Sequence, residues 1–458
     1  MRKVIFLLLA FIIIISSHNF IIASQNKIRV GLESNKNLLI KNKEIYIGFE
    51  DKFIKDKFSA GNKNNFKLDI NKKFYIDTQS NYNNYQETLL KKNDFIKKNK
   101  NQTVICFNNI NSWSIYLGPF DSLEKANLAN KNINGKIISP DKKKLFLLES
   151  DKTCLLINNN SFRVKACDPS GLINLDDKKY RDTIEFILVN KDKSKIIPVN
   201  ILPLNKYLYG VLPSEMPTNW PEEALKAQAI VARTYALKSL ELNRHEYYDL
   251  CDCVHCQNYL GANSESNRVN KIIDKTFDLC IYNNNKLINA TFFSSSGGAT
   301  ENSEDVWIEK FDYLRGKKNP PSLKEISKSW TYEFTGSQIK KNLSKKNIDI
   351  GDILDIKILE NLPSGRVSKL LVSGSSGEKI FYKEEIRKVF CKSSGQMLDS
   401  RLFKIDSSDI NSDYKIKLSG TGFGHGVGLS QYGAKAMAES DYNYLDIIKY
   451  YYTDVDIK

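Results

Sequence analysis

The chain has 458 residues, which is enough for two or three domains with sizeable hydrophobic cores. Lys and Arg (68) outnumber Asp and Glu (53), so the formal net charge is +15. A charge of this sign favours acidic partners: nucleic acid, an anionic lipid surface, or wall glycans with their peptide carboxylates. No stretch has the pattern of an RNA-binding or helix-turn-helix module, which argues against nucleic acid and favours an envelope partner.

The N-terminus has the pattern of a secretory signal. Arg2 and Lys3 precede an unbroken apolar run over residues 4–15, and the polar residues 16–19 separate it from a second short apolar run. This arrangement is typical of a signal peptide, and the polar break argues against one continuous membrane-spanning helix. We expect residues 1–24 to be a signal peptide or membrane anchor, and the protein to be exported to the periplasm or cell wall.

Residues 25–160 predict a small β-rich N-terminal domain that ends at an Asn-rich turn. Short apolar runs such as 44–49 predict strands between polar Lys/Asn-rich loops. Within 105–140, a strand pattern leads through a Gly-Pro-Phe turn to Ser122, which we interpret as the N-cap of a helix over 123–131. This order resembles half of a SPOR-like unit, a fold associated with binding glycan strands. The alternative is a purely structural βα unit.

The densest motif lies at residues 202–240. The apolar run 207–212 predicts a buried strand or strand end, and the prolines that follow it predict a turn. The last of them, Pro221, suits the first position of a helix, and Glu222 and Glu223 suit the positive end of a helix dipole. The stretch therefore predicts a strand, a turn and a helix.

Three ionisable residues in this stretch are candidates for chemistry. Glu215 lies in the predicted turn among Pro, Met and Trp residues, and such an apolar setting raises the pKa of a carboxylate towards that of a general acid. The alternative is a solvated glutamate that caps the helix. Lys226 and Arg233 are seven residues apart and share one helix face, where the alternative is a solvated surface.

The motif is longer than these three residues. Its segments are YLYGV at 207–211, EMP at 215–217, Trp220, EALKAQA at 223–229 and ARTYA at 232–236. Together they resemble the signature of the SpoIID/LytB family, the stage II sporulation protein D type of peptidoglycan lytic transglycosylase. The resemblance implies that Glu215 is the catalytic acid/base and that Lys226 and Arg233 support activity.

A cluster of Cys and His residues follows in the segment HEYYDLCDCVHC at 245–256. Eight cysteines in an exported chain ordinarily predict disulfides, but three of them lie here beside two histidines, a mixture that suits tetrahedral Zn²⁺. The alternative is a disulfide with unrelated histidines. The resemblance implies three zinc ligands, Cys251, His255 and Cys256, and His245 could supply a fourth. Cys253 has no family counterpart and could compete as a ligand or pair with another cysteine. If His245 is a ligand, four protein donors leave no place for a substrate water, so we expect a structural zinc and no cofactor for the chemistry.

A Ser/Gly turn, SSSGGATE, follows a predicted strand at 289–293. Because no Gly-x-Ser-x-Gly motif is present, a nucleophilic serine is not supported. The family has a similar turn followed by the sequence EDVW, which is present here at 304–307. The resemblance implies that Ser296, Gly297 and Gly298 line the glycan cleft.

Alternating glycines occupy residues 419–434, SGTGFGHGVGLSQYGA. They do not fit the dinucleotide-binding pattern, and instead predict a backbone that approaches a ligand closely. Ser430 is expected to cap a helix that begins at Gln431. The block matches the family's second signature, which implies that Tyr432 is catalytic and that Gln431 contacts substrate. His425 is a candidate proton or hydrogen-bond donor for substrate, or alternatively a structural histidine.

These patterns predict an α+β protein, with a SpoIID-like catalytic domain over 161–458. The resemblance implies a lytic transglycosylase that cleaves the bond between N-acetylmuramic acid and N-acetylglucosamine, with formation of the 1,6-anhydro sugar. The alternatives are a non-catalytic peptidoglycan-binding enhancer of a wall amidase, and a metallo-hydrolase that uses the Cys/His cluster. We expect glycan strands as the main partner, with a wall amidase in the enhancer alternative, membrane contact only through the N-terminal segment, and no nucleic acid.

Overall fold

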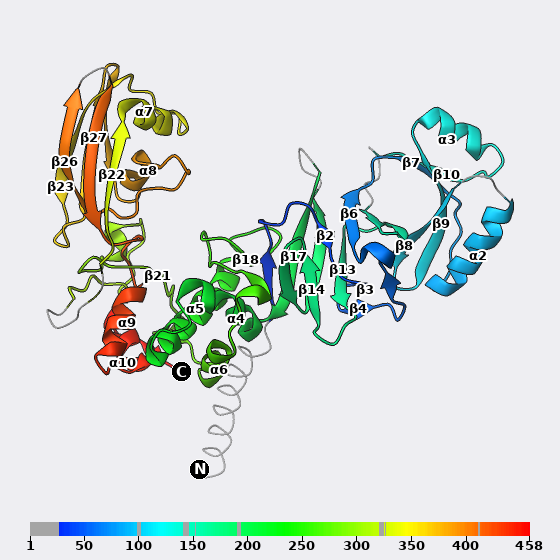
Figure 1. The fold of residues 1–458 in the computed structure, drawn as a ribbon, viewed down its shortest axis with the longest axis horizontal. Helices are drawn as coiled ribbons and strands as arrows, with labels where there is room; N and C mark the ends of the chain where they lie inside the picture. The colour runs from blue at the N-terminus through cyan, green and yellow to red at the C-terminus, as the bar shows by residue number, and fades with distance from the viewer. Residues whose placement is uncertain are drawn as a thin grey trace, which may run out of the picture. The chain divides into compact units, whose positions relative to one another are not determined.

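The computed structural model describes residues 27–458 apart from 99–101, 141–145, 152, 190–193, 320–324, 326 and 411–412 (Figure 1). The chain separates into two compact units. The first contains the residues up to Glu215 together with Ser239–Asn267, and the second contains Met216–Lys238 together with Arg268–Lys458. The predicted signal segment lies outside the described residues. Among the helices that are described, none has both the length and the apolar composition that crossing a bilayer requires.

The first unit contains an eight-stranded sheet with the order β18-β1-β17-β16-β13-β3-β4, in which β5 also pairs with β3. Its strands are β1 (Lys27–Gly31), β3 (Glu44–Phe49), β4 (Lys52–Phe53), β5 (Phe58–Ser59), β13 (Ser161–Ala166), β16 (Thr183–Val189), β17 (Lys195–Pro203) and β18 (Leu250–Cys251). Neighbouring strands are antiparallel except β18, which runs parallel to β1. Because β1 and β3 pair with strands that follow residue 160, the predicted boundary there does not coincide with the division between the units.

A ten-stranded sheet with the order β10-β7-β9-β8-β12-β11-β6-β2-β14-β15 completes the first unit. Its strands are β2 (Leu39–Ile40), β6 (Phe66–Ile70), β7 (Phe74–Asp77), β8 (Thr103–Asn109), β9 (Ser112–Phe120), β10 (Lys136–Ile138), β11 (Phe146–Glu149), β12 (Cys154–Ile157), β14 (Leu172–Leu175) and β15 (Lys178–Arg181). Two helices, α2 (Tyr85–Lys98) and α3 (Leu123–Asn130), interrupt this series (Figure 1). The chain order from β7 to β10 is therefore βαββαβ.

The βαββαβ segment extends the half-unit predicted at 105–140. Ser122 caps α3 as expected, since its side chain accepts a hydrogen bond from the backbone N–H of Lys125. The predicted Gly-Pro-Phe turn is wrong, because β9 continues through a cis Gly118–Pro119 bond. Strands β8 and β9 are buried over most of their length on both faces, so neither sheet face is open along them. Glycan binding by this segment stays a prediction.

Helix α4 (Leu204–Glu215) corrects the strand predicted at 207–212. Most of that run is buried, and a short apolar run that is buried all round has no periodicity to separate a helix from a strand. Pro213 lies inside the last turn of α4, so the helix extends beyond the proline that was expected to begin a turn.

The second unit contains most of α5 and the remaining helices. They are α5 (Glu222–Leu242), α6 (Asn267–Lys275), α7 (Gly336–Ser344), α8 (Glu385–Val389), α9 (Gln431–Glu439) and α10 (Tyr444–Tyr451). Its strands are β19 (Ile281–Asn283), β20 (Lys286–Leu287), β21 (Phe292–Phe293), β22 (Ser329–Thr335), β23 (Ile353–Asn361), β24 (Val367–Gly374), β25 (Gly377–Tyr382), β26 (Phe403–Ile410), β27 (Tyr414–Thr421), β28 (Leu429–Ser430) and β29 (Asp456–Ile457). They form small sheets with the orders β20-β19-β29, β21-β28, β22-β27-β26 and β23-β24-β25.

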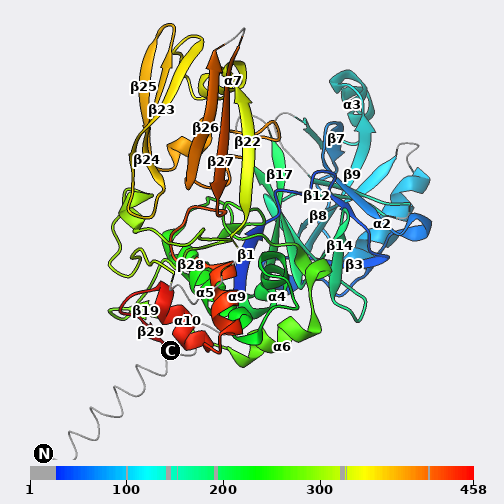
Figure 2. The same cartoon turned by 60° about the vertical axis from the view of Figure 1, so that its left-hand side comes forward.

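The sheets β22-β27-β26 and β23-β24-β25 share one core with α7 and α8 (Figure 2). That core contains Leu343, Val372, Phe381, Phe390 and Leu418, all almost fully buried. Helices α9 and α10 pack against each other and against the short strand β28. The predicted α+β class is confirmed.

Candidate active site

Glu215 is the last residue of α4 and is half-buried. Its Oε1 accepts a hydrogen bond of 3.0 Å from the backbone N–H of Asn258. The hydroxyl of Ser214 also bonds to the carbonyl oxygen of Asn258, and the hydroxyl of Tyr207 donates to Gln257 Oε1 at 3.1 Å. The loop at 257–258 therefore holds the end of α4 that carries the predicted acid. The raised pKa expected for Glu215 stays a prediction.

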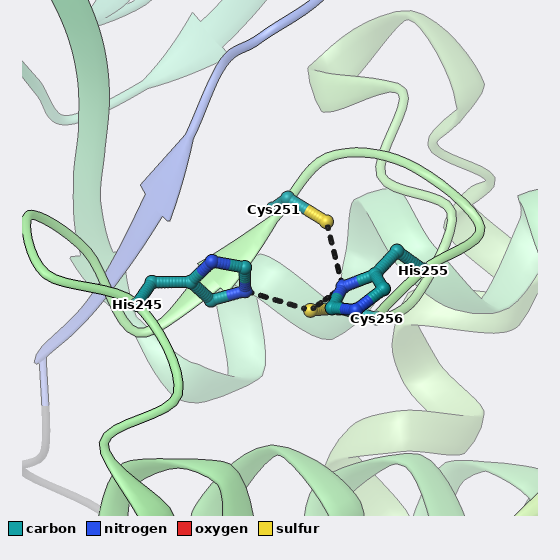
Figure 3. A group of neighbouring side chains, drawn as sticks. All are labelled: His245, Cys251, His255 and Cys256. Atoms are coloured by element: carbon teal, nitrogen blue, oxygen red, sulfur yellow. Dashed lines mark hydrogen bonds between the residues drawn. The ribbon is translucent and has the colours of Figure 1, made fainter. Parts of the chain in front are cut away.

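The predicted metal ligands form one group in the first unit (Figure 3). His245 Nε2 lies 3.3 Å from Cys256 Sγ, and His255 Nδ1 lies 3.5 Å from Cys256 Sγ and 3.8 Å from Cys251 Sγ. All four ligand atoms lie within 4.8 Å of one another. In a tetrahedral site, Zn–S bonds of about 2.3 Å and Zn–N bonds of about 2.0 Å place sulfur and nitrogen about 3.5 Å apart. The donor set and its spacing therefore fit a zinc ion.

Cys253 lies beside this group rather than within it. Its Sγ is 3.0 Å from Cys251 Sγ, and it is not one of the four clustered ligands.

Hydrogen bonding from the Cys251 thiol lowers the pKa of Cys256 to about 7, which favours the thiolate form that binds metals. Cys251 belongs to β18 and is buried, so one ligand stands on the sheet and the others on the loops before and after it.

Lys226 organises the first turn of α5. Its Nζ lies 2.7 Å from Glu223 Oε1 and 3.2 Å from Glu222 Oε1. The other carboxylate oxygen of Glu223 accepts a 2.9 Å hydrogen bond from the backbone N–H of Tyr444 at the start of α10. Lys226 thus neutralises two carboxylates, one of which fixes α10 against α5.

Arg233 is buried, with 1% of its surface exposed. Its guanidinium donates to the carbonyl oxygens of Leu279 at 3.1 Å and Ile273 at 3.3 Å. The solvated surface considered for it is wrong, and a buried guanidinium that bonds to carbonyls cannot reach a polymeric substrate. These bonds hold α5 against α6 and the segment that follows it.

The structure brings the Ser/Gly turn and the glycine block together, although more than a hundred residues separate them. Strands β21 and β28 pair in parallel, and Ser295 and Phe423 exchange backbone hydrogen bonds beyond the strands. The backbone N–H of Tyr432 donates to the carbonyl oxygen of Ser294 at 2.9 Å. Two of the predicted substrate contacts are buried in this structure. Ser296 is 0% exposed and its hydroxyl donates to Glu325, and Gln431 is 6% exposed, so neither is open to a glycan as the side chains stand.

Glycines of this block allow close packing against other parts of the protein. This corrects the expectation that they allow a ligand to approach the backbone closely. Gly428 has φ +80°, and a Cβ there would lie 2.0 Å from the carbonyl oxygen of Thr291. A Cβ on Gly426 would lie 2.8 Å from Arg366 Nε. Gly298 differs, because a Cβ there would meet nothing within 4 Å among the described residues. Of these glycines, only Gly298 has open space beside it.

His425 is a structural histidine rather than a proton donor to substrate. Its Nδ1 accepts from the backbone N–H of Val427 at 3.1 Å, which leaves Nε2 to donate to the carbonyl oxygen of Phe292 at 3.0 Å. Its ring packs between Trp307 and Phe293, at centroid distances of 5.0 and 5.4 Å. Desolvation, reinforced by nearby arginines, lowers its pKa to about 3, so the ring is neutral at physiological pH.

We expect this half-buried neutral His425 to make the protein less stable in acid. Below its ordinary pKa of 6.5 the unfolded histidine takes up a proton that the folded one refuses until about pH 3, so acid favours unfolding across that window. The slope from this group is at most about 1.4 kcal/mol per pH unit. Urea unfolding at pH 4, 5, 6 and 7 should give a steeper fall for wild type than for His425→Asn. Parallel curves for the two proteins would contradict the assignment.

Tyr432 is half-buried and belongs to a group of aromatic and cationic side chains in the second unit. Lys328 Nζ lies 5.4 Å from the centre of the Tyr432 ring and 5.9 Å from that of Phe423, which is 43% exposed. Trp220 packs edge-on behind Tyr432 at a centroid distance of 4.9 Å, and Lys435 Nζ lies 6.0 Å from the Trp220 ring. Aromatic faces suit the apolar side of a sugar ring, and the lysines suit its carboxylates.

Three residues that contact the Ser/Gly turn or Tyr432 could not be identified from the sequence. Glu325 and Arg366 bond to Ser296, and Lys328 lies beside the Tyr432 ring. All lie in the stretch 308–410, where the sequence shows no motif. Asn258 lies two residues after Cys256, within the segment Gln257-Asn258-Tyr259 that follows the Cys/His cluster. Its position, though not its hydrogen bond to Glu215, could have been singled out from the sequence.

Two family models match parts of the chain. A family model described as stage II sporulation protein (SpoIID) matches residues 192–282, which include Glu215 and the Cys/His cluster. A second model, described as a domain of unknown function (DUF8618), matches residues 317–428.

Individual proteins are similar over more of the chain. Stage II sporulation protein D of Bacillus subtilis is 33% identical over 276 residues, which cover 57% of this chain and 75% of that protein. An uncharacterized protein of Brachyspira hyodysenteriae is 30% identical over 286 residues, covering 62% of this chain and 73% of that protein. The amidase enhancer of Bacillus subtilis is 31% identical over 336 residues, covering 64% of this chain but only 46% of that protein.

Proposed function

The chain belongs to the SpoIID family, and from this premise we propose that it is a peptidoglycan lytic transglycosylase with Glu215 as its single acid/base. The observation that supports this most is the fixed position of the carboxylate. Glu215 ends a helix, is half-buried, and has one oxygen held by the backbone N–H of Asn258. A general acid must be held in place in this way to reach a leaving oxygen.

One carboxylate is enough if the substrate supplies the nucleophile. Glu215 donates its proton to O4 of N-acetylglucosamine as the bond from C1 of N-acetylmuramic acid to that oxygen breaks. The carboxylate then accepts the proton of the C6 hydroxyl, whose oxygen bonds to C1 and closes the 1,6-anhydro ring. Glu215 gives up one proton and regains one, and no water is consumed. Hydrolysing glycosidases, in contrast, use two carboxylates and a water molecule.

The other predicted residues have supporting roles in this proposal. Tyr432, with Phe423 and Lys328, offers an aromatic and cationic surface for sugar rings and their carboxylates. Lys226 and Arg233 act as positioning residues, the first through Glu223 and the second through the carbonyls it binds. The Cys/His cluster would hold a structural zinc, which supplies no chemistry to the reaction.

Mass analysis of soluble products from purified sacculi tests this function. Incubation with the exported chain should release muropeptides that end in 1,6-anhydro-N-acetylmuramic acid. Hydrolysed reducing ends in their place would show a glycosidase and overturn the proposal. The protein would act outside the cytoplasm on glycan strands, with no nucleic-acid partner.

A second candidate function comes from the name of one relative, the amidase enhancer of Bacillus subtilis. In that case the chain would bind glycan strands and stimulate a wall amidase without cleaving them. No soluble anhydro product, together with faster peptide release by an added amidase, would favour this alternative. A metallo-hydrolase is less well supported, since the four clustered ligands already complete a tetrahedral shell.

A further inference from the structure

The side chain of Glu325 is surrounded by hydrogen-bond donors. One carboxylate oxygen accepts from the backbone N–H of Ser296 at 2.6 Å, from Ser295 Oγ at 3.1 Å and from Ser430 Oγ at 3.0 Å. The other accepts from Ser296 Oγ and from Asn319 Nδ2, each at 2.5 Å. We call Ser295, Ser296, Asn319 and Ser430 the carboxylate cradle. Its three serines are at most 1% exposed.

Backbone groups orient the cradle hydroxyls towards an anion. Ser296 Oγ accepts from the N–H of Gly298 at 3.0 Å, and Ser430 Oγ accepts from the N–H of Gly433 at 3.2 Å. A hydroxyl that accepts from the backbone has its own hydrogen left to donate, and both donate to Glu325. The cradle is thus arranged to donate before any ligand arrives.

A helix N-terminus and a buried arginine lie near the cradle. Ser430 is the N-cap of α9, where the helix dipole favours negative charge. Arg366 donates to the carbonyl oxygens of Ser296 at 2.6 Å and Ala299 at 2.7 Å. Arg366 is 1% exposed and also pairs with Glu301 Oε1 at 3.5 Å, so that carboxylate balances part of its charge.

We propose that the cradle is a carboxylate-binding subsite for the muramyl unit of the substrate, which Glu325 fills as an internal ligand. The cradle recognises both oxygens of one carboxylate and is built on the Ser/Gly turn and the start of α9. Tyr432 of the candidate sugar-binding surface is two residues from Ser430. This inference rests on the proposed function, because only a peptidoglycan substrate brings the sugar concerned.

The chemistry of the two sugars makes the subsite specific. N-acetylmuramic acid carries a lactyl carboxylate at O3, and N-acetylglucosamine is the same sugar without it. In strands that bear peptides the lactyl group is an amide, and the free carboxylates are those of the peptide. Glu325 and a substrate carboxylate exclude each other from the cradle, so removing Glu325 should expose a site that selects the acid sugar.

Calorimetric titration with the two monosaccharides tests this. Glu325→Ala should bind N-acetylmuramic acid about tenfold or more tightly than wild type does, as expected for a charge-assisted contact, and N-acetylglucosamine unchanged. Adding Ser296→Ala to that variant should abolish the gain. An equal gain with N-acetylmuramoyl-dipeptide, whose lactyl group is an amide, shows that the subsite also accepts a peptide carboxylate; no gain restricts it to the lactyl group.

Glu325→Ser serves as a second variant if Glu325→Ala does not fold, because a side chain shorter by two carbons also leaves the cradle unfilled. Equal affinity of wild type and both variants for the two sugars would overturn the proposal and leave Glu325 as a structural anchor. The proposed function fails separately: anhydro products without the gain refute only the subsite, and the gain without anhydro products refutes only the transglycosylase.

Discussion

Replacing Glu215 by Gln is expected to lower the release of anhydro-muropeptides from purified sacculi by about 10²–10⁴-fold, the usual worth of a general acid or base. Glutamine keeps the shape of the side chain and its acceptor for the Asn258 N–H, but it cannot transfer a proton at neutral pH. Retention of the variant on sacculi in a pull-down should equal that of wild type. The rate is measured by mass spectrometry of the soluble fraction over time.

Two further variants keep this result interpretable. Glu333→Gln removes an exposed carboxylate on β22, far along the chain from Glu215, and should leave the rate unchanged. Glu215→Asp keeps the acid but withdraws it by one methylene, so activity should fall between wild type and Glu215→Gln. Full activity of Glu215→Gln would refute the role of this residue.

Local signals predicted local structure correctly. Pro221 directly precedes α5, and Glu222 and Glu223 lie in its first turn, because an unpaired N–H and a helix dipole act within a few residues. Ser430 caps α9, accepting from the N–H of Gly433, for the same reason. The four metal ligands also lie within twelve residues, so their grouping needed little tertiary information.

Where burial determines whether a segment forms a helix or a strand, the sequence pattern was ambiguous or misleading. Most of the run 207–212 is buried and it has no clear helical period, so a strand was predicted where α4 lies. Helix α2 was missed within a polar region, although Asn84 and Glu87 carry a capping signal: the Asn84 side chain accepts from the N–H of Glu87, and Glu87 accepts from Asn83.

The candidate site shows the same limit. Alternating glycines predicted a close approach, but not that the partner at Gly428 is the carbonyl oxygen of Thr291. His425 could be catalytic or structural on sequence alone, and only its two backbone partners decide between these. Glu325 carries no signal at all, because its five donors come from three separate segments that the fold brings together.

Replacing a metal ligand is expected to have the largest effect on stability. Cys256→Ser should lose the bound zinc and lower the free energy of unfolding by about 4 kcal/mol when zinc is present at 1,000 times its dissociation constant. The physical reason is that binding to the folded state alone stabilises it, and a serine hydroxyl is a poor replacement for a thiolate. Elemental analysis gives the zinc content, and thermal unfolding with and without a chelator gives the loss.

The other cysteines provide matched controls for Cys256→Ser. Cys253→Ser should keep one zinc per chain, since Cys253 lies beside the four ligands rather than among them. Cys391→Ser, in the second unit, should change neither zinc content nor unfolding. If Cys253→Ser loses zinc and a Cys251→Ser variant keeps it, the ligand assignment is wrong, and Cys253 rather than Cys251 binds the metal.

Loss of zinc should also slow glycan cleavage, through the loop rather than through the reaction. Cys256 is a ligand, and two residues later the N–H of Asn258 holds Glu215. Freeing that loop would loosen the acid, so cleavage should fall in step with the fraction of protein that has lost zinc and its local order. If a chelator stops cleavage at once while circular dichroism and unfolding temperature stay at their zinc-bound values, the metal takes part in the chemistry, and the single-carboxylate mechanism is wrong.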